Sequence, residues 1–251
     1  MLPEEARPRL AALGFTPRDV DTLARHFLDA ERRGLLGHGL SRIEWLETWP
    51  ELPTGLRPRR VASEPGYERW DGDGALGYVV LEEVVEAQLA APPEHSRVVV
   101  CSRTFPTGSL GYWVRRLAEG GLVGLLTATS PRRLASPAGG PPLTGTNPLA
   151  IAIPSSDGHP VVADVSMGAV THGEVLAGRA RPEQLVPFGG EQAYKAFALA
   201  VGLQLVVDAL TPEDEHGAVL IVARPEADPV PGLRALANGI RLPGDAVEGG
   251  V

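Results

Sequence analysis

The chain has 251 residues and a formal net charge of −8, with 31 acidic side chains against 23 basic ones. The acidic balance and an aromatic content of 5% argue against nucleic acid or an anionic membrane as the main partner, because both need clustered positive charge. The N-terminus lacks a signal-peptide core, no apolar stretch approaches the ~20 residues of a membrane helix, and Cys101 is the only cysteine, so we expect a cytoplasmic protein without an intrachain disulfide.

The N-terminal third is predicted to be mainly helical. A hydroxyl cap followed by a proline, Thr16-Pro17, opens the first clear helix, and apolar residues at helical spacing continue it to Glu31. A glycine-rich break over 34–39 follows this helix. Residues 54–74 are rich in Pro, Arg and Gly and indicate a connector. The helices expected in this part span 17–31, 41–49 and 77–91.

Farther along the chain the pattern is mixed, with a long loop dense in Pro and Gly over 131–147. Helices first and mixed elements afterwards predict an α+β protein. We divide it into an N-terminal helical part, 1–70, with 225–251 packing back on it, and a central α/β domain, 71–224. The expected strands are 98–100, 122–129, 148–153, 161–165 and 218–223, and the expected helices are 110–118 and 193–210.

Lysine and asparagine are both scarce in this chain. One of the 23 basic residues is a lysine, Lys195, and Asn147 and Asn238 are the two asparagines. A coding bias that replaces Lys by Arg and avoids Asn is the simplest cause. Under such a bias, a surviving Lys or Asn is expected where its own chemistry is required, because an ammonium and a guanidinium are not equivalent donors.

The first candidate for chemistry is Gly37-His38-Gly39-Leu40-Ser41-Arg42. A histidine between glycines can approach a ligand closely, and its ordinary pKa of about 6.5 suits proton transfer near neutrality. If a helix begins near Ser41, Arg42 lies one turn away and can pair with a carboxylate through two parallel hydrogen bonds. A helix-capping loop with an ordinary surface His and Arg fits the same residues.

Three further segments hold polar residues beside predicted strands or helices. Thr146 and Asn147 precede a strand and can offer donors to a phosphate or an amide, although a turn in which Asn147 bonds its own backbone is the simpler interpretation. Gly189 and Lys195 flank the start of a helix, where an anion can bind, and a loop with a surface lysine is the alternative interpretation. The third segment follows a buried strand and contains Asp164, Ser166, Thr171 and His172. His172, next to Gly173, is a second candidate acid or base, although a structural hydrogen-bond donor is the simpler interpretation.

Other common sites are not indicated. No glycine fingerprint for a dinucleotide or a P-loop follows a predicted strand. No cysteine or histidine pair has metal-ligand spacing, so no metal site is expected.

Together these segments resemble the type 2 malate/L-lactate dehydrogenases, a family that includes sulfolactate, ureidoglycolate and 2,3-diketogulonate enzymes and the reductases of piperideine- and pyrroline-2-carboxylate. The resemblance is collinear from about residue 5 to 247. It rests on Gly37–Arg42, Asp71–Gly77, Gly145–Ala150, Asp164–Met167, and Val186–Gly190 with Tyr194-Lys195.

The resemblance implies a fold with helices around a large, mainly antiparallel sheet, without a Rossmann domain, in a homodimer. It implies hydride transfer between NADPH or NADH and the C2 carbonyl or imine of a small carboxylated substrate. His38 would then be the proton donor, and Arg42, Thr107 and His172 would hold the substrate. The residues expected along the cofactor are Thr146, Asn147, Pro148, Asp164, Ser166, Gly189 and Lys195.

Departures from this family include a second shortening after Leu210, Gly37 in place of Ser and Ala196 in place of Gly, and two others bear most directly on the site. The chain is shorter, with the largest gap between Glu174 and Val186, where the family has a segment that shapes the cofactor cleft. Pro106 also stands where the family has a second active-site histidine. Both changes affect parts of the site that orient the reactants, and orientation can lower the activation barrier by several kcal/mol.

Three hypotheses follow. The first is a shortened NAD(P)H-dependent reductase of a 2-oxo or cyclic imino acid, serving a specialised biosynthesis. The second is a cofactor-independent isomerase, cyclase or lyase that uses His38 for proton transfer. The third is a non-catalytic dimeric binding protein, and apolar side chains filling the space around His38 and Lys195 would favour it.

Overall fold

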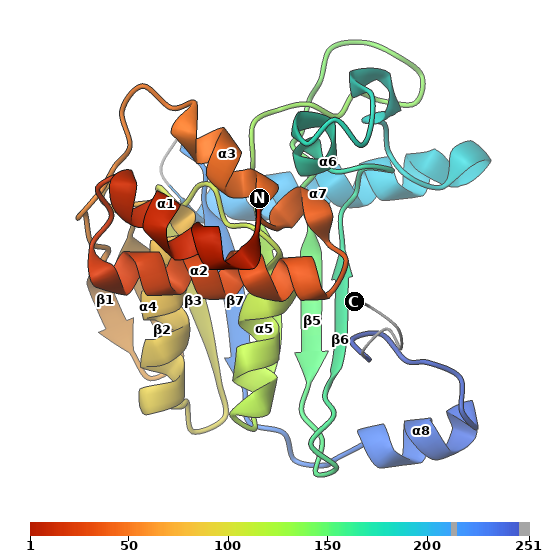
Figure 1. Cartoon of the computed structure of the whole chain (residues 1–251). Helices are drawn as coiled ribbons and strands as arrows, with labels where there is room; N and C mark the ends of the chain where they lie inside the picture. The colour runs from red at the N-terminus through yellow and green to blue at the C-terminus, as the bar shows by residue number, and fades with distance from the viewer. Residues whose placement is uncertain (212–214, 246–251) are drawn as a thin grey trace.

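The computed structural model describes residues 1–211 and 215–245. In these residues, seven strands form one sheet, with most helices packed on one of its faces (Figure 1). The strands are β1 Arg59–Glu64, β2 Tyr67–Asp71, β3 Ser96–Ser102, β4 Val123–Ala128, β5 Leu149–Ile153, β6 Val161–Val165 and β7 Ala218–Ala223. The helices are α1 Ala6–Ala12, α2 Pro17–Arg32, α3 Ser41–Glu47, α4 Gly77–Ala90, α5 Leu110–Glu119, α6 His172–Leu176, α7 Ala193–Leu210 and α8 Val230–Ala237, with short 3-10 turns η1 Pro3–Glu5, η2 Leu36–His38, η3 Pro182–Gln184 and η4 Gly190–Gln192.

The sheet has the order β1-β2-β3-β7-β4-β5-β6. Every neighbouring pair is antiparallel except β2 with β3, which is parallel. This arrangement confirms the expected α+β class, with N-terminal helices beside a mainly antiparallel sheet and without the parallel sheet of a Rossmann fold.

The core lies between the sheet and two layers of helix. Helices α4 and α5 lie next to each other on the sheet side, and α2 crosses both of them (Figure 1). α2 begins where the sequence predicts, because the Thr16 hydroxyl accepts a hydrogen bond from the Asp19 N–H at 3.3 Å. Its apolar stripe buries Leu23 and Phe27 completely. α4 buries most of its residues because it lies against α2 and α5.

The expected connector over 54–74 is wrong, because β1 and β2 lie within it. β1 is an exposed edge strand with a polar sequence, so it lacks the apolar alternation that identifies a strand. β2 does alternate, but one of its buried residues is Glu68, which accepts hydrogen bonds from Trp70 Nε1 and Gln88 Nε2, both at 2.9 Å. The proposed boundary at residue 70 therefore divides one sheet within β2.

The C-terminal segment also differs from expectation. Residues 225–251 were expected to pack on the N-terminal helices, and 246–251 lie outside the described residues. The described part packs instead beside the β5–β6 hairpin, where the Val162 N–H donates to the Pro243 carbonyl at 3.0 Å. Arg234 on α8 donates to the His159 carbonyl and to Asp245, at 2.9 and 2.8 Å. The abundant Pro and Gly in this segment concealed the short helix α8.

Helix α7 has the predicted bounds and is unusually exposed. It buries Ala196, Ala200 and Val207, while Leu199 and Leu205 remain 51% and 60% exposed. Contrary to the expectation from sequence, Gly190–Leu210 is long and apolar enough to cross a membrane by length and composition. Those two criteria are weak evidence, because helices of soluble proteins also meet them.

Candidate active site

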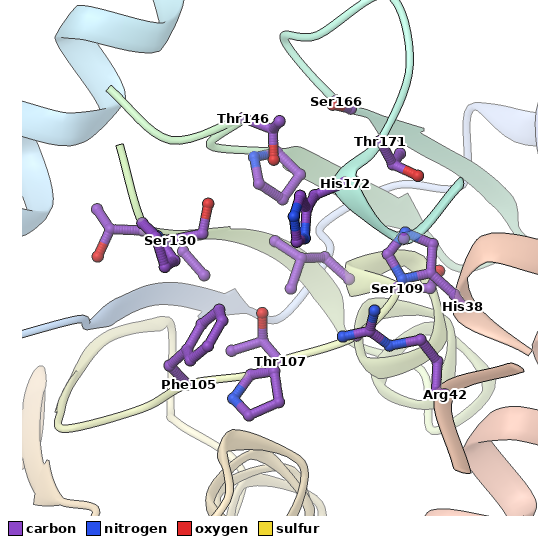
Figure 2. A pocket seen from close by; sticks show the side chains of 18 of the residues that line it. His38, Arg42, Phe105, Thr107, Ser109, Ser130, Thr146, Ser166, Thr171 and His172 are labelled. Carbon is purple, nitrogen blue, oxygen red and sulfur yellow. The ribbon is translucent and has the colours of Figure 1, made fainter. Parts of the chain in front are cut away.

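A cavity of about 260 Å³ opens at the edge of the sheet where β4 and β6 end and β5 begins. The turn η2, the start of α3, the segment before α5 and the start of α6 complete its wall (Figure 2). Segments far apart in the sequence therefore meet here. Its principal polar and aromatic lining residues are His38, Arg42, Trp45, Phe105, Thr107, Ser109, Ser130, Arg133, Thr146, Asp164, Ser166, Thr171 and His172.

His38 is placed in the cavity by the tight turn η2 at the end of α2. The His38 N–H donates to the Leu35 carbonyl at 2.8 Å. Glu31 on α2 accepts a hydrogen bond from the Leu40 N–H at 2.9 Å. A side chain at Gly39 would collide with the Glu31 carboxylate. The glycine after His38 therefore leaves room for Glu31 to accept this hydrogen bond, which holds the loop that carries His38 against α2.

Arg42 lies one helical turn farther, in α3, and is 7% exposed. Its guanidinium carbon lies 3.8 Å from the centre of the Trp45 ring. Among the described residues no carboxylate forms an ion pair with it, and its Nε has no hydrogen-bond partner. A buried charge without a partner costs free energy. The unpaired guanidinium of Arg42 therefore points to an anionic ligand that pairs with it.

The cavity floor, residues 107–109, is held by side chains beneath it. Trp113 Nε1 donates to the Thr107 carbonyl at 2.9 Å, and the buried His26 Nε2 accepts from the Ser109 N–H at 3.1 Å. A Cβ at Gly108, whose φ is +71°, would collide with His26. The floor is therefore rigid and carries no side chain at its centre.

Asp164 fixes the start of α5 from the opposite wall. Its Oδ2 accepts from the Ser109 hydroxyl at 2.9 Å and from the Gly111 N–H at 2.7 Å. A carboxylate at the N-terminus of a helix is favourably placed in the helix dipole. This side chain thus already has partners within the protein and shapes the cavity as well as lining it.

Two histidines in the cavity have lowered pKa values. Burial, and then the positive charge of Arg42, lower the pKa of His38 to about 4. Burial lowers the pKa of His172 to about 4 as well, with Arg133 and Arg42 contributing in that order. Both imidazoles are therefore neutral near pH 7 in the free protein, and each offers one N–H donor and one acceptor.

We expect the free protein to lose stability as the pH falls from about 6.5 toward about 4. Over this interval the unfolded chain protonates these histidines while the folded chain does not. Each such group lowers the free energy of unfolding by up to ~1.4 kcal/mol per pH unit. Urea unfolding between pH 8 and 4.5 measures the slope, and His38→Gln should reduce it. A stability that is constant or rises toward pH 4.5 would contradict this expectation.

The structure brings most of the predicted site residues into this cavity. Those that line it are His38, Arg42, Thr107, Thr146, Pro148, Asp164, Ser166 and His172. Gly189 and Lys195 do not line it. Lys195 is exposed in the first turn of α7, with Nζ 5.8 Å from the Tyr194 ring centre.

Asn147 is also outside the cavity lining and is fully buried. Its Nδ2 donates to the Ala200 carbonyl at 3.1 Å and to Gln204 Oε1 at 2.9 Å, so it fastens the preceding loop to α7. Its φ is +28°, and that of Asn238 is +48°. Asparagine adopts positive φ more readily than other residues with a side chain, which explains why both asparagines persist in an Asn-poor chain.

Several side chains that shape the site were not predicted from the sequence. Trp45 lies three residues after Arg42 on the same helix face, and that spacing could have identified it. Phe105, Ser109, Ser130 and Arg133 come from loops, whose path the sequence does not determine. In the described ranges, no three His, Cys, Asp or Glu side chains gather as metal ligands would.

Part of the polar lining is suited to a neutral ligand group, in addition to the anion that would pair with Arg42. The hydroxyls of Thr107, Ser130 and Thr146 line the cavity, and within the described part of the chain none of them makes a hydrogen bond to protein. Figure 2 shows Ser130 on the side away from His38 and Arg42, with Thr107 and Thr146 between them. Unpartnered hydroxyls can donate to and accept from a carboxamide.

Comparison with known proteins places the chain among dehydrogenases of small acids, by sequence. The family model described as malate/L-lactate dehydrogenase matches residues 2–191. A (2R)-3-sulfolactate dehydrogenase (NADP(+)) of Chromohalobacter salexigens is 31% identical over 70% of this chain and 54% of its own length. A malate dehydrogenase of Pyrococcus horikoshii is 30% identical over 66% of this chain and 47% of its own length. The chain thus spans about half the length of the curated relatives it matches.

Solved structures with the same fold cover nearly the whole chain. A dehydrogenase from Sinorhizobium meliloti has a TM-score of 0.77 at 26% identity and covers 98% of this chain and 90% of that one. A Δ1-piperideine-2-carboxylate reductase from Pseudomonas syringae has a TM-score of 0.83 with the same coverage. At 22% identity, the second likeness shows the fold alone.

Proposed function

This chain belongs to the malate/L-lactate dehydrogenase family, and from that premise we propose that it reduces the C2 carbonyl or imine of a small 2-oxo or cyclic imino acid with NADPH or NADH. The observation that carries the proposal is the buried, unpaired guanidinium of Arg42 beside the imidazole of His38 in one cavity. The names of the relatives, a sulfolactate and a malate dehydrogenase, agree with an acidic substrate.

Arg42 binds the carboxylate of the substrate. Its guanidinium is covered on one face by Trp45, so the N–H groups at its edge are the donors that remain for a planar partner. A carboxylate that forms two parallel hydrogen bonds with it is fixed in orientation as well as in place. The charge that is unpaired in the free protein is then compensated, which favours binding.

His38 supplies the proton to the reacting oxygen or nitrogen. The positive charge of Arg42 is one cause of the low pKa of His38. A bound carboxylate offsets that charge, so substrate binding raises the pKa of His38 toward the range in which it can carry a proton. The substrate thus prepares its own proton donor, and the proton reaches the atom whose charge develops during reduction.

The residues present fit one end of a nicotinamide cofactor. The unpartnered hydroxyls of Thr107, Ser130 and Thr146 suit the carboxamide, and the cofactor would supply the hydride for C2. The other end fits less closely, because Gly189 and Lys195 do not line the cavity. The exposed Arg133, which does line the cavity, would be a cation available to the diphosphate.

Titration of NADPH and NADH, followed by nucleotide fluorescence, tests this function. We expect saturable micromolar binding of one nucleotide, weakened by Thr146→Val and little affected by Lys195→Ala. Oxidation of the bound nucleotide is then measured against a panel of 2-oxo and cyclic imino acids. Binding of neither nucleotide would overturn the redox function and direct attention to a cofactor-free proton transfer at His38.

We also propose that a second copy of the chain covers α7. A helix that is apolar on most sides is normally enclosed, yet Leu199 and Leu205 are more than half exposed. Sedimentation velocity should show a dimer of the wild type at micromolar concentration and a larger monomer fraction for Leu205→Glu. A wild type that sediments as a monomer at all concentrations would exclude this interface.

A further inference from the structure

The chain between β6 and α7 leaves the body of the protein and returns to the same place. The Ala169 N–H donates to the Val186 carbonyl at 2.7 Å, and the Phe188 N–H donates to the Met167 carbonyl at 3.2 Å. These bonds enclose residues 170–184, the α6 segment, which Figure 1 shows at the top of the view beyond the end of β6. The two ends of the segment are therefore fixed side by side.

The α6 segment is held together by its own hydrogen bonds. Glu174 is at their centre, because its N–H donates to the Thr171 hydroxyl at 3.2 Å and its carboxylate accepts from the Thr171 N–H at 2.6 Å. The Glu174 carbonyl also accepts from the Arg179 N–H at 2.8 Å. Farther along, Gln184 Oε1 accepts from the Arg181 N–H at 2.9 Å. The segment can therefore keep its shape if it moves as one body.

Few contacts hold the α6 segment to the rest of the protein. Within the part of the chain that the structure describes, none of its groups forms a hydrogen bond or an ion pair with a residue outside 166–188. Gly173 is buried, and every other residue of 170–184 is at least partly exposed. Segments with so little burial separate from the body of a protein more easily than its core elements do.

The contact at Gly173 is made between two backbones. Gly173 meets Gly37 in η2, the turn that carries His38. A Cβ at Gly37 would lie 2.7 Å from the Glu174 nitrogen, and one at Gly173 would collide with the Gly37 carbonyl oxygen. Neither glycine has a positive φ, so the close approach excludes a side chain here and the backbone conformation does not. Any side chain at position 37, including the Ser that the family resemblance implies, would push the two elements apart.

This contact closes one side of the cavity. Thr171, His172 and Gly173 of the α6 segment line the cavity, and so does His38 of η2 (Figure 2). If the contact between Gly37 and Gly173 separates, the cavity opens between these two elements, next to His38. An open wall admits a ligand, and a closed one excludes water from the reacting atoms.

We propose that the α6 segment is a lid, which pivots about its fixed ends at 167–169 and 186–188 and closes on a bound acid through the contact between Gly37 and Gly173. Glycine has no side-chain entropy to lose, so this contact forms and separates at little cost. The proposal rests on the proposed function only for the nature of the ligand, a small 2-oxo acid.

The distance between two spin labels, measured by pulsed dipolar spectroscopy, tests the lid. Arg179→Cys places one label on the α6 segment and Glu119→Cys places the other at the end of α5, both at exposed positions. The native Cys101 stays unlabelled, because it is fully buried and burial raises its pKa to about 12. We expect a closed and an open distance in the free protein. Oxamate, a planar analogue of 2-oxo acids, should reduce the open population.

Glycine substitutions test the closing contact without any ligand. Gly37→Ala should lower the ratio of closed to open lid about 10- to 100-fold, because its methyl group meets the backbone of Glu174. Gly173→Ala tests the same contact from the other side and should act in the same way. Gly232→Ala in α8 is the matched control, since nothing lies within 4 Å of a Cβ there, and it should leave the distances unchanged. Thermal unfolding confirms that each variant is folded.

The outcomes separate the lid from the proposed function. Distances that Gly37→Ala and Gly173→Ala leave unchanged overturn the lid, and so do distances that stay the same when calorimetry shows that oxamate is bound. If oxamate does not bind at millimolar concentration, the proposed function is overturned, whereas the glycine variants still decide whether the segment opens. An open population that grows in both glycine variants and shrinks with oxamate supports both proposals.

Discussion

Replacing His38 with alanine should lower kcat/KM for substrate reduction by about 10²- to 10⁴-fold, the usual contribution of a positioned proton donor. The loss should appear in kcat, because Arg42 still binds the carboxylate and the cavity wall is otherwise unchanged. Nucleotide affinity should remain within about two-fold of the wild type, since the proposed contacts to the carboxamide are the hydroxyls of Thr107, Ser130 and Thr146 and not His38.

The stability of this variant is informative as well. His38 is neutral, and its imidazole has no hydrogen-bond partner among the described residues, so its removal should change the free energy of unfolding by less than about 1 kcal/mol at pH 7.5. His95→Ala serves as the matched control for activity. Near-normal turnover by a folded His38→Ala protein would remove His38 from the mechanism.

Replacing Arg42 with glutamine should separate activity from stability. We expect kcat/KM to fall by about 10³-fold, mainly through KM, because the substrate carboxylate loses its two charge-assisted hydrogen bonds. The free energy of unfolding should not fall, because the substitution removes a buried charge that no carboxylate in the described residues compensates. The pKa of His38 should rise from about 4, since Arg42 is one of the causes that lower it.

Arg97 is a suitable control for the stability measurement. It is also largely buried, but it lies 3.3 Å from the carboxylate of Glu68. Arg97→Gln should therefore lower the free energy of unfolding by about 1–3 kcal/mol and leave substrate affinity unchanged. Equal destabilisation in the two variants would mean that the guanidinium of Arg42 is compensated in the free protein, and its charge would then give no reason to expect an anionic ligand.

The sequence predicted the elements with strong local signals and missed those that depend on tertiary context. α2 has a hydroxyl cap, a proline and an apolar stripe, and its predicted start is correct. β1 and β2 have no such signals, because one is a polar edge strand and the other buries Glu68. The short helices α6 and α8 bury few side chains, so no periodicity marks them.

The residues of the cavity also differ in how far the sequence could predict them. The Gly37–Arg42 element identified two side chains that lie together, because one turn of helix connects them. The scarcity of asparagine drew attention to Asn147, which has a positive φ and two hydrogen bonds to α7, and its contact with a cofactor stays a prediction. The contact between Gly37 and Gly173 could not be foreseen, since it depends on how distant segments pack.

The position of β7 in the sheet constrains the order in which the protein can assemble. β7 lies between β3 and β4, yet it is the last strand among the described residues. Before it is added, β1-β2-β3 and β4-β5-β6 are two separate three-stranded pieces, each with an unpaired edge. During synthesis on the ribosome, β3 and β4 therefore stay unpaired on one side until residue 223 has been made. In this interval, pairing of these strands with another chain is the main risk of aggregation.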